Sequence, residues 1–219
     1  AHSYSVAPFI EGSKPIGDEI EQLRVWKTLG RYAAFLNAVR PPEVGSNESA
    51  YFPADWKQQV VSDVGLIFKD NFWLNRGLLS ADQQERVRDY LVGASGVPVN
   101  HGVCMFDLTI ANAVICDSDY DRIFLLDLEA ANIAPVPFYQ LACIAADRGP
   151  ESKETEAFFE GYGIDSREAG RISEELNLFT LYRLMRATAW ARDRYPALLE
   201  ENIQRTRAVL ESTLKRNSW

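Results

Sequence analysis

The chain of 219 residues is 47% hydrophobic and 25% charged, and its 23 Lys and Arg residues against 31 Asp and Glu residues give a net charge of −8. This composition supports a sizeable core and excludes a disordered, collagen-like or disulfide-framework protein. The acidic balance argues against nucleic acid as a partner, since phosphate contacts need a basic face. Most of the excess acid is typical of a soluble surface, although it is also compatible with a cationic substrate or a bound metal.

The N-terminal third predicts one strand followed by helices. Residues 3–10 form a short apolar run that ends at a turn, which indicates a strand. A helix follows, with Asp18 as its start and Pro41 as its stop. Residues 43–53 are a polar loop, and the aromatic-rich residues 54–78 are predicted to be mostly helical.

Helices are also predicted on both sides of the central segment. Ser80 and the glutamine three residues later have the pattern of a capping box, and the helix that they start ends near Gly93. Residues 148–155 are a polar loop between helices. Residues 158–163 end a helix at a glycine, and the remaining C-terminal residues carry apolar stripes typical of core helices.

The cysteines and histidines show no metal-binding pattern. Cys104, Cys116 and Cys143 do not have zinc spacing, and the two histidines, His2 and His101, exclude a multi-histidine site. We interpret the cysteines as reduced, mostly buried thiols. The sequence shows no apolar run long enough for a membrane span and no signal-peptide pattern, so we expect a cytoplasmic protein with no membrane partner.

The central segment predicts a β-hairpin. Strands over residues 113–116 and 122–126 flank a polar turn over residues 117–121. Asn112 stands directly before the first strand, and Asp127 directly follows the second. Because a tight hairpin returns its second strand to the start of its first, these two side chains are expected at the same end of the ribbon.

This arrangement suits phosphoryl-transfer chemistry. An amide oxygen and a carboxylate are hard ligands that Mg²⁺ accepts together with water and phosphate. Asp107, five residues before Asn112, is placed to receive a proton from an attacking hydroxyl. A lone Asp or Asn in such a position is more often a cap or turn residue. Asp127 fits that interpretation least, because it ends an apolar strand abruptly.

The pattern Asp107-Leu-Thr-Ile-Ala-Asn112, then a hairpin, then Leu-Asp127-Leu-Glu129 resembles the catalytic loop and metal-binding aspartate of the aminoglycoside phosphotransferase and choline kinase family. The resemblance implies Asp107 as catalytic base, and Asn112 and Asp127 as Mg²⁺ ligands. It implies Glu129 as a further acidic group near the metal or the substrate. ATP and Mg²⁺ are the implied cofactors.

The resemblance also implies an α+β, mainly α-helical fold, namely the C-terminal lobe of a protein-kinase-like fold with the metal site on a short β-hairpin. Residues 7–12 look like the hinge between the lobes. We therefore expect an interlobe hinge segment over residues 1–17, a helical lobe over residues 18–219, and no N-terminal β lobe. The backbone that would border the adenine is that of Val6, Pro8, Phe9 and Ile10.

Three features depart from the family pattern. Met105 stands where the family has the histidine of His-Gly-Asp, and His101 lies four residues too early. Either the loop has an insertion, or the similarity of His101 and the glycine after it is accidental. Gln140 replaces an aspartate that braces the catalytic loop. The glycine-rich loop and the phosphate-binding lysine of an N-terminal lobe are absent.

Three functions follow as hypotheses. The first is ATP-dependent phosphorylation of a hydroxyl on an aminoglycoside, an amino-alcohol or a sugar-like acceptor, with this chain as a C-terminal lobe that is inactive without its N-terminal lobe. The second is a catalytically inactive, kinase-like module that binds or scaffolds a partner. The third is metal-dependent hydrolysis through Asp107, Asp127 and Glu129, although two-metal hydrolases usually gather more ligands.

The acceptor site and the exposed interlobe surface are the remaining expectations. Residues 43–53 and 148–165 are the segments expected to form the acceptor pocket. The aromatic residues that could line a cationic pocket, or belong to the core instead, are Tyr51, Trp73 and Trp190. An isolated lobe would expose an apolar patch that favours self-association or docking of the missing lobe, formed by Phe9, Ile10 and Leu126.

Overall fold

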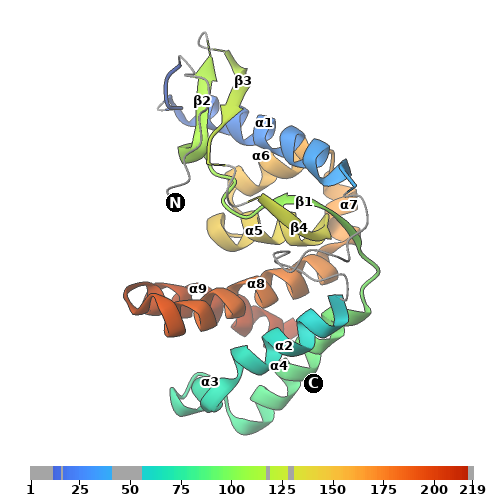
Figure 1. Cartoon of the computed structure of the whole chain (residues 1–219), viewed down its shortest axis with the longest axis vertical. Helices are drawn as coiled ribbons and strands as arrows, with labels where there is room; N and C mark the ends of the chain where they lie inside the picture. The colour runs from blue at the N-terminus through green and yellow to red at the C-terminus, as the bar shows by residue number, and fades with distance from the viewer. Residues whose placement is uncertain (1–11, 16, 41–55, 117–118, 128–130, 217–219) are drawn as a thin grey trace, which may run out of the picture.

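The computed structural model describes residues 12–15, 17–40, 56–116, 119–127 and 131–216. It confirms an α+β fold that is mainly α-helical (Figure 1). The helices are α1 Glu19–Ala38, α2 Trp56–Ile67, α3 Phe72–Asn75, α4 Ala81–Gly93, α5 Phe138–Arg148, α6 Lys153–Tyr162, α7 Ser166–Arg171, α8 Ser173–Arg194 and α9 Leu199–Arg216. The strands are β1 Asn100–Met105, β2 Ala113–Cys116, β3 Asp119–Leu125 and β4 Ala131–Val136.

The described strands form two small antiparallel sheets. Strands β2 and β3 make the predicted hairpin, with Ala113 opposite Leu125, and it projects beyond α1 in Figure 1. Strand β1 pairs with β4, so that Met105 lies opposite Ala131. The second sheet was not predicted, and it joins the two ends of the central segment.

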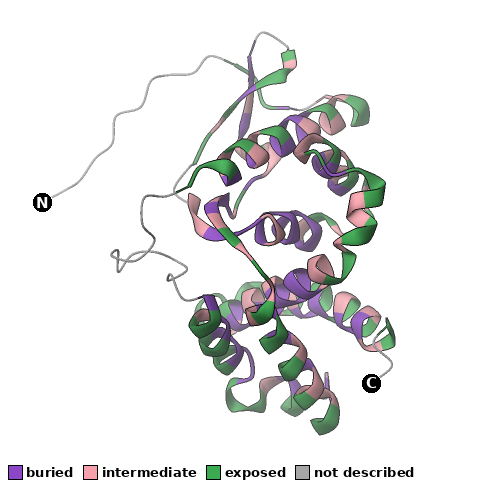
Figure 2. Cartoon of the chain, turned by 90° about the vertical axis from the view of Figure 1, so that its right-hand side faces the viewer, coloured by how far each residue is buried: buried purple, intermediate pink, exposed green. Residues whose placement is uncertain are grey.

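Two hydrophobic clusters meet at α5. One packs α2, α4 and α8 around aromatic side chains that include Trp56 and Phe179, whose rings stack at 5.6 Å. The other packs α1 and α6 against the β2–β3 hairpin around Trp26 and Phe158. Residues Tyr139 through Ala146 of α5 are all buried, because both clusters cover this helix. Figure 2 shows the burial concentrated where the elements face one another.

Most predicted helix boundaries are confirmed. Asp18 and Ser80 both start helices with complete capping boxes, and Gly163 ends α6 in the left-handed conformation. The predicted helix over residues 54–78 is wrong in one respect, because it breaks at Asp70 and Asn71, which have φ of 56° and 51°.

Smaller predictions have mixed outcomes. The turn over residues 117–121 is shorter than expected, since residues 119–121 belong to β3. The three cysteines are free and buried, as expected. Within the described part of the chain, the helices are too short or too polar to cross a membrane. The predicted N-terminal strand over residues 3–10 lies outside the described residues.

Helices α1 and α6 approach closely enough that their backbones touch. A Cβ atom on Gly30 would lie 2.1 Å from the carbonyl oxygen of Phe158, and one on Gly161 would lie 1.8 Å from that of Lys27. Glycine is required at these crossing points because the colliding atoms are backbone and cannot rotate away. The contact fixes α1, and therefore the hairpin that packs on it, against the rest of the lobe.

We expect Gly30→Ala to lower the free energy of unfolding by about 1–3 kcal/mol, because the added methyl overpacks a backbone contact. The matched control is Gly65→Ala, which lies inside α2 with no atom within 4 Å of the new Cβ. That change should be neutral or stabilise the protein by up to about 1 kcal/mol through helix propensity. Denaturant unfolding of both variants measures the difference, and equal effects would contradict the close contact.

Candidate active site

The loop that carries Asp107 is anchored on both sides of that residue. Met105 and Leu108 are buried in the cluster around Trp26. The ring of Phe106 packs edge-on against Tyr139 of the other cluster, with the ring centroids 5.4 Å apart. Asp107 itself is exposed. Because its neighbours are held by two different clusters, the carboxylate is presented to solvent from a fixed piece of backbone.

Gln140 provides the polar anchor of this loop. Its side-chain Nε2 donates to the carbonyl oxygen of Met105 at 3.0 Å, and its Oε1 accepts from the Met105 N–H at 3.0 Å. Gln140 is fully buried on α5. Gln140 stands where the family has an aspartate, yet it still holds the loop, because an amide can donate and accept hydrogen bonds at once.

Asn112 connects Asp107 to the hairpin. Its Nδ2 donates to the Oδ2 carboxylate oxygen and to the backbone oxygen of Asp107, both at 3.0 Å. Its backbone oxygen accepts from Leu126 N at 2.8 Å. Asp127, the next residue along, is thereby brought beside Asn112 at the base of the hairpin.

Asp127 is exposed and has a φ of 54°, in the left-handed region. Non-glycine residues rarely adopt this conformation, and such strain concentrates at functional sites. The turn of the backbone ends β3 abruptly after Leu125. Asp127, which the sequence analysis proposed as a metal ligand, therefore has an unusual backbone conformation.

The donor set fits a hard divalent cation. Two side chains, Asn112 and Asp127, offer an amide oxygen and a carboxylate, and Mg²⁺ usually takes few protein ligands and completes its shell with water and phosphate. The Nδ2 of Asn112 is engaged by Asp107, and its Oδ1 accepts no hydrogen bond from the described residues. Among these residues no group of three His, Cys, Asp or Glu side chains is arranged for a metal.

Several predicted site residues lie outside the described residues. They are Glu129 and the four residues assigned to the adenine, Val6, Pro8, Phe9 and Ile10. His101 is described, and it lies in β1 opposite Pro135 rather than in the loop. It therefore does not supply the family's loop histidine, and burial lowers its pKa.

A pocket of about 360 Å³ opens between α5, α8 and α9. Asp147 lines it, and burial raises the pKa of Asp147, while the charges of Arg183 and Arg205 oppose that shift. Among the described residues that line this pocket, Asp107 is not included. Its charged lining, which sequence reasoning missed, includes Arg183 and Arg186. The only sequence signal is a pair of arginines three residues apart within a buried helical stripe.

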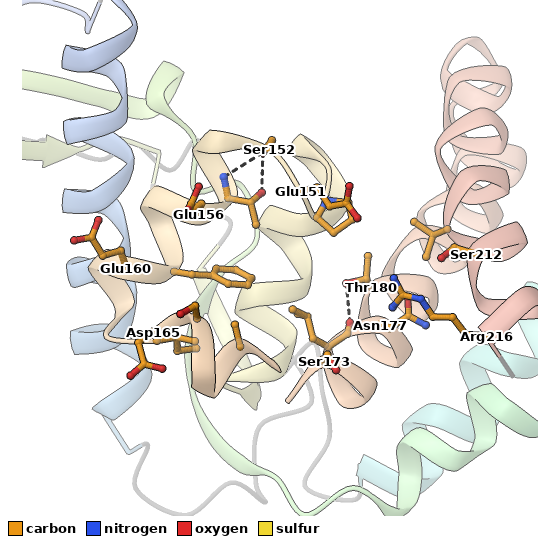
Figure 3. A pocket seen from close by; sticks show the side chains of 18 of the residues that line it. Glu151, Ser152, Glu156, Glu160, Asp165, Ser173, Asn177, Thr180, Ser212 and Arg216 are labelled. Carbon is orange, nitrogen blue, oxygen red and sulfur yellow. Dashed lines mark hydrogen bonds between the residues drawn. The ribbon is translucent and has the colours of Figure 1, made fainter. Parts of the chain in front are cut away.

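A larger groove of about 850 Å³ lies along α6, α7, α8 and α9. Figure 3 shows it between Ser152 and Glu156 on one side and Asn177 and Arg216 on the other. Many of its lining residues come from the segment 148–165, which was expected to form the acceptor pocket. Of the candidate residues that the structure describes, Asp107, Asn112 and Asp127 do not line this groove.

Of the three aromatic residues expected either to line a cationic pocket or to belong to the core, two are described. Trp73 is buried in the core and donates its Nε1–H to Ile67 O at 3.0 Å, so it does not line a pocket. Trp190 lines the pocket between α5, α8 and α9 and stacks on Tyr195, with the ring centroids 4.5 Å apart. Tyr51 lies outside the described residues. Leu126 is 41% exposed, as expected for the interlobe patch.

The fold is shared with solved kinase structures. A choline/ethanolamine kinase family protein from Mesorhizobium loti is similar at 16% identity and a TM-score of 0.61, over 93% of this chain and 67% of that one. The structure of APH(2″)-IIia with GDP and kanamycin is similar at 13% identity and a TM-score of 0.63, over 95% and 70%. Plasmodium vivax ethanolamine kinase is similar at 15% identity and a TM-score of 0.58, over 92% and 63%.

The chain thus has the fold of the C-terminal part of choline kinases and aminoglycoside phosphotransferases, as its central motif predicted. It spans about two thirds of the length of these structures. Comparison with protein-family models gives no match, and comparison with curated proteins gives none either.

We expect Gln140→Leu to lower the free energy of unfolding by about 2 kcal/mol or more, because it strands a buried N–H and a buried carbonyl of Met105. Hydrogen exchange at the Met105 amide should quicken in the same variant. The control is Gln204→Leu on the exposed face of α9, which should change stability by no more than about 0.5 kcal/mol. An unchanged exchange rate at Met105 would show that Gln140 does not hold the loop.

Proposed function

We propose that this chain is the C-terminal lobe of an ATP-dependent small-molecule phosphotransferase that phosphorylates a hydroxyl group. The observation that carries the proposal is the hydrogen-bonded link from Asp107 through Asn112 to the base of the hairpin, next to Asp127. The shared fold with choline kinases and aminoglycoside phosphotransferases supports it. In this proposal residues 1–17 are the interlobe hinge, and residues 18–219 are the helical lobe.

Asp107 is the proposed general base. Its carboxylate is exposed, and one of its oxygens accepts from Asn112, which restricts the rotation of the side chain. The acceptor hydroxyl gives its proton to Asp107 while its oxygen bonds to the γ-phosphorus of ATP, and the bond to the leaving ADP breaks. Positioning and charge supply most of the catalysis in this reaction class.

Asn112 and Asp127 are the proposed Mg²⁺ ligands. When bound there, the ion supplies neutralisation of the phosphate charge. The hydrogen bond from Leu126 N to Asn112 O keeps the two ligands together, and the strained backbone of Asp127 directs that residue away from the strand. Glu129 is proposed as a further acidic group, and the backbone of Val6, Pro8, Phe9 and Ile10 as the adenine border.

A kinase-like binding module without catalysis is the second candidate. Met105 favours it, because it cannot make the hydrogen bonds of the histidine that it replaces. Gln140 does not favour it, since this residue braces the loop through two hydrogen bonds. The two candidates differ in whether the protein binds Mg²⁺-ATP and turns it over.

We expect Asp127→Asn to weaken Mg²⁺-ATP binding at least about tenfold, because the only carboxylate of the described ligand pair is lost. Isothermal titration on the full-length protein, with any upstream residues that its gene encodes, measures this. Glu174→Gln, an exposed acid in the first turn of α8, is the matched control and should bind normally. Equal affinities for Asp127→Asn and the wild type would overturn the metal role.

Asp107→Asn should lower turnover by about 10²–10⁴-fold, since the amide cannot take up the hydroxyl proton. Its affinity for Mg²⁺-ATP should stay close to that of the wild type, because Asp107 is not a proposed ligand. Product formation with a panel of hydroxyl acceptors measures the change. Undiminished turnover would remove Asp107 as the base, and a wild type that binds nucleotide without any turnover would favour the binding module.

A further inference from the structure

The groove along α6, α7, α8 and α9 lies on the seam between the two hydrophobic clusters. Of its lining residues, Phe159 and Ile164 belong to the cluster of α1 and α6, and Val209 packs against the cluster of α2, α4 and α8. Leu176 packs against both clusters. The volume of about 850 Å³ lies within the range of small-molecule sites, which commonly form between helices over an apolar floor.

The polar side chains of this floor are already satisfied within the protein. The hydroxyls of Thr155 and Thr180 donate to backbone carbonyls at 2.8 Å and 2.7 Å. The Asn177 amide nitrogen donates to a buried threonine hydroxyl of α9 at 3.0 Å. A ligand therefore finds few unused hydrogen-bonding groups on the floor, and the charges at the rim become the polar features that distinguish one ligand from another.

The charged residues at the rim differ in whether the protein already uses them. Glu160 forms an ion pair with Lys27 of α1. Asp165 caps α7 by accepting from Glu168 N at 2.7 Å. Within the described part of the chain, three charged side chains of the lining have no ion-pair or hydrogen-bond partner, and they are Glu151, Glu156 and Arg216.

The free charges lie on opposite sides of the groove. Figure 3 shows Glu151 and Glu156 on the two sides of Ser152, whereas Arg216 lies across the groove beside Asn177. Two carboxylates beside an apolar floor attract a positive group, and Arg216 repels the same group from the far side. A ligand with one positive charge is therefore expected to place that charge next to α6 and its apolar part over the floor.

We propose that this groove binds a small amphiphilic cation, a molecule with an apolar body and one positively charged group, and that Glu151 and Glu156 hold the charged group. The proposal is independent of phosphoryl transfer, because Asp107, Asn112 and Asp127 line no part of the groove. An anion is disfavoured, since it would meet two unpaired carboxylates and one arginine. The volume suits a ligand of drug size, whose body the apolar floor removes from water.

The proposal is tested by binding to the full chain without nucleotide or metal. Three probes share one ring system: naphthylmethylamine is the cation, naphthoate the anion and naphthylmethanol the uncharged form. Tetramethylammonium is a cation without the apolar body. In isothermal titration we expect the amine to bind about tenfold or more tightly than naphthoate, and more tightly than the other two probes. Its affinity should fall as the salt concentration rises.

Charge variants identify the residues responsible. Glu151→Gln and Glu156→Gln should each weaken binding of the amine about two- to fivefold, which is the size expected for an exposed charge pair. Arg216→Gln should leave the affinity unchanged or raise it, because it removes a repelling charge. The matched control is Glu174→Gln, an exposed acid of α8 outside the groove lining, which should bind as the wild type does.

Ala208→Trp tests the groove itself without changing a charge. Ala208 is exposed and lines the groove from α9, so an indole at this position occupies the groove and leaves the core in place. Binding of the amine should be lost in this variant. Its thermal unfolding midpoint, expected to stay close to that of the wild type, shows that the loss does not come from unfolding.

Several outcomes would overturn the proposal. They are binding of any other probe as tightly as the amine, no binding of the amine at millimolar concentration, and unchanged affinity in both glutamate variants or in Ala208→Trp. A dimer in light scattering that Ala208→Trp dissociates would overturn it as well, since a second copy of the chain would then occupy the groove. If the amine binds as expected but the protein transfers no phosphate, this inference stands and the phosphotransferase proposal fails.

Discussion

The pair of hydrogen bonds between the Gln140 amide and the Met105 backbone is the constraint on which the candidate site depends. Asp107 has to be exposed to act as a base, yet an exposed loop residue is usually free to move. The loop is fixed on its buried side, where the Gln140 side chain bonds to the Met105 backbone. Gln140 belongs to α5, whose neighbouring residues are buried in apolar contacts. An amide can satisfy a backbone donor and a backbone acceptor together, whereas an ionised carboxylate can only accept, so Gln140 can hold the loop in place of the family's aspartate.

The same helix also connects the loop to the pocket between α5, α8 and α9. Residues near the start of α5 hold Met105 and Phe106, whereas Asp147 near its end lines the charged pocket. The loop that carries the proposed base and one wall of this pocket are therefore positioned by the same helix. Two of the pocket's arginines are neutralised within the protein, since Arg205 pairs with Glu201 and Arg186 with Asp63.

Local chemistry was predictable from the sequence, whereas long-range pairing was not. The caps at Asp18 and Ser80, the hairpin and the approach of Asn112 to the end of β3 all follow from neighbouring residues. Strands β1 and β4 lie far apart in the chain, and Gly102 and Pro135 weaken their strand pattern, so their pairing was missed. The helix predicted over residues 54–78 breaks at Asp70, where the sequence has no glycine or proline that would indicate a break. The charged pocket gives little signal in the sequence, because Asp147, Arg183 and Glu201 meet only when α5, α8 and α9 pack together.

The β1–β4 ladder has a further consequence for the segment that it encloses. Met105 and Ala131 lie opposite each other, so the chain leaves the helical scaffold and returns to it at a single point. The described residues between them are nevertheless tied to the scaffold, because Leu108, Ile115 and Ile123 are buried in the cluster around Trp26 that also covers α5. A protein engineer could therefore vary the exposed residues of this segment, whereas an exchange of its buried apolar residues would require α1 and α5 to repack.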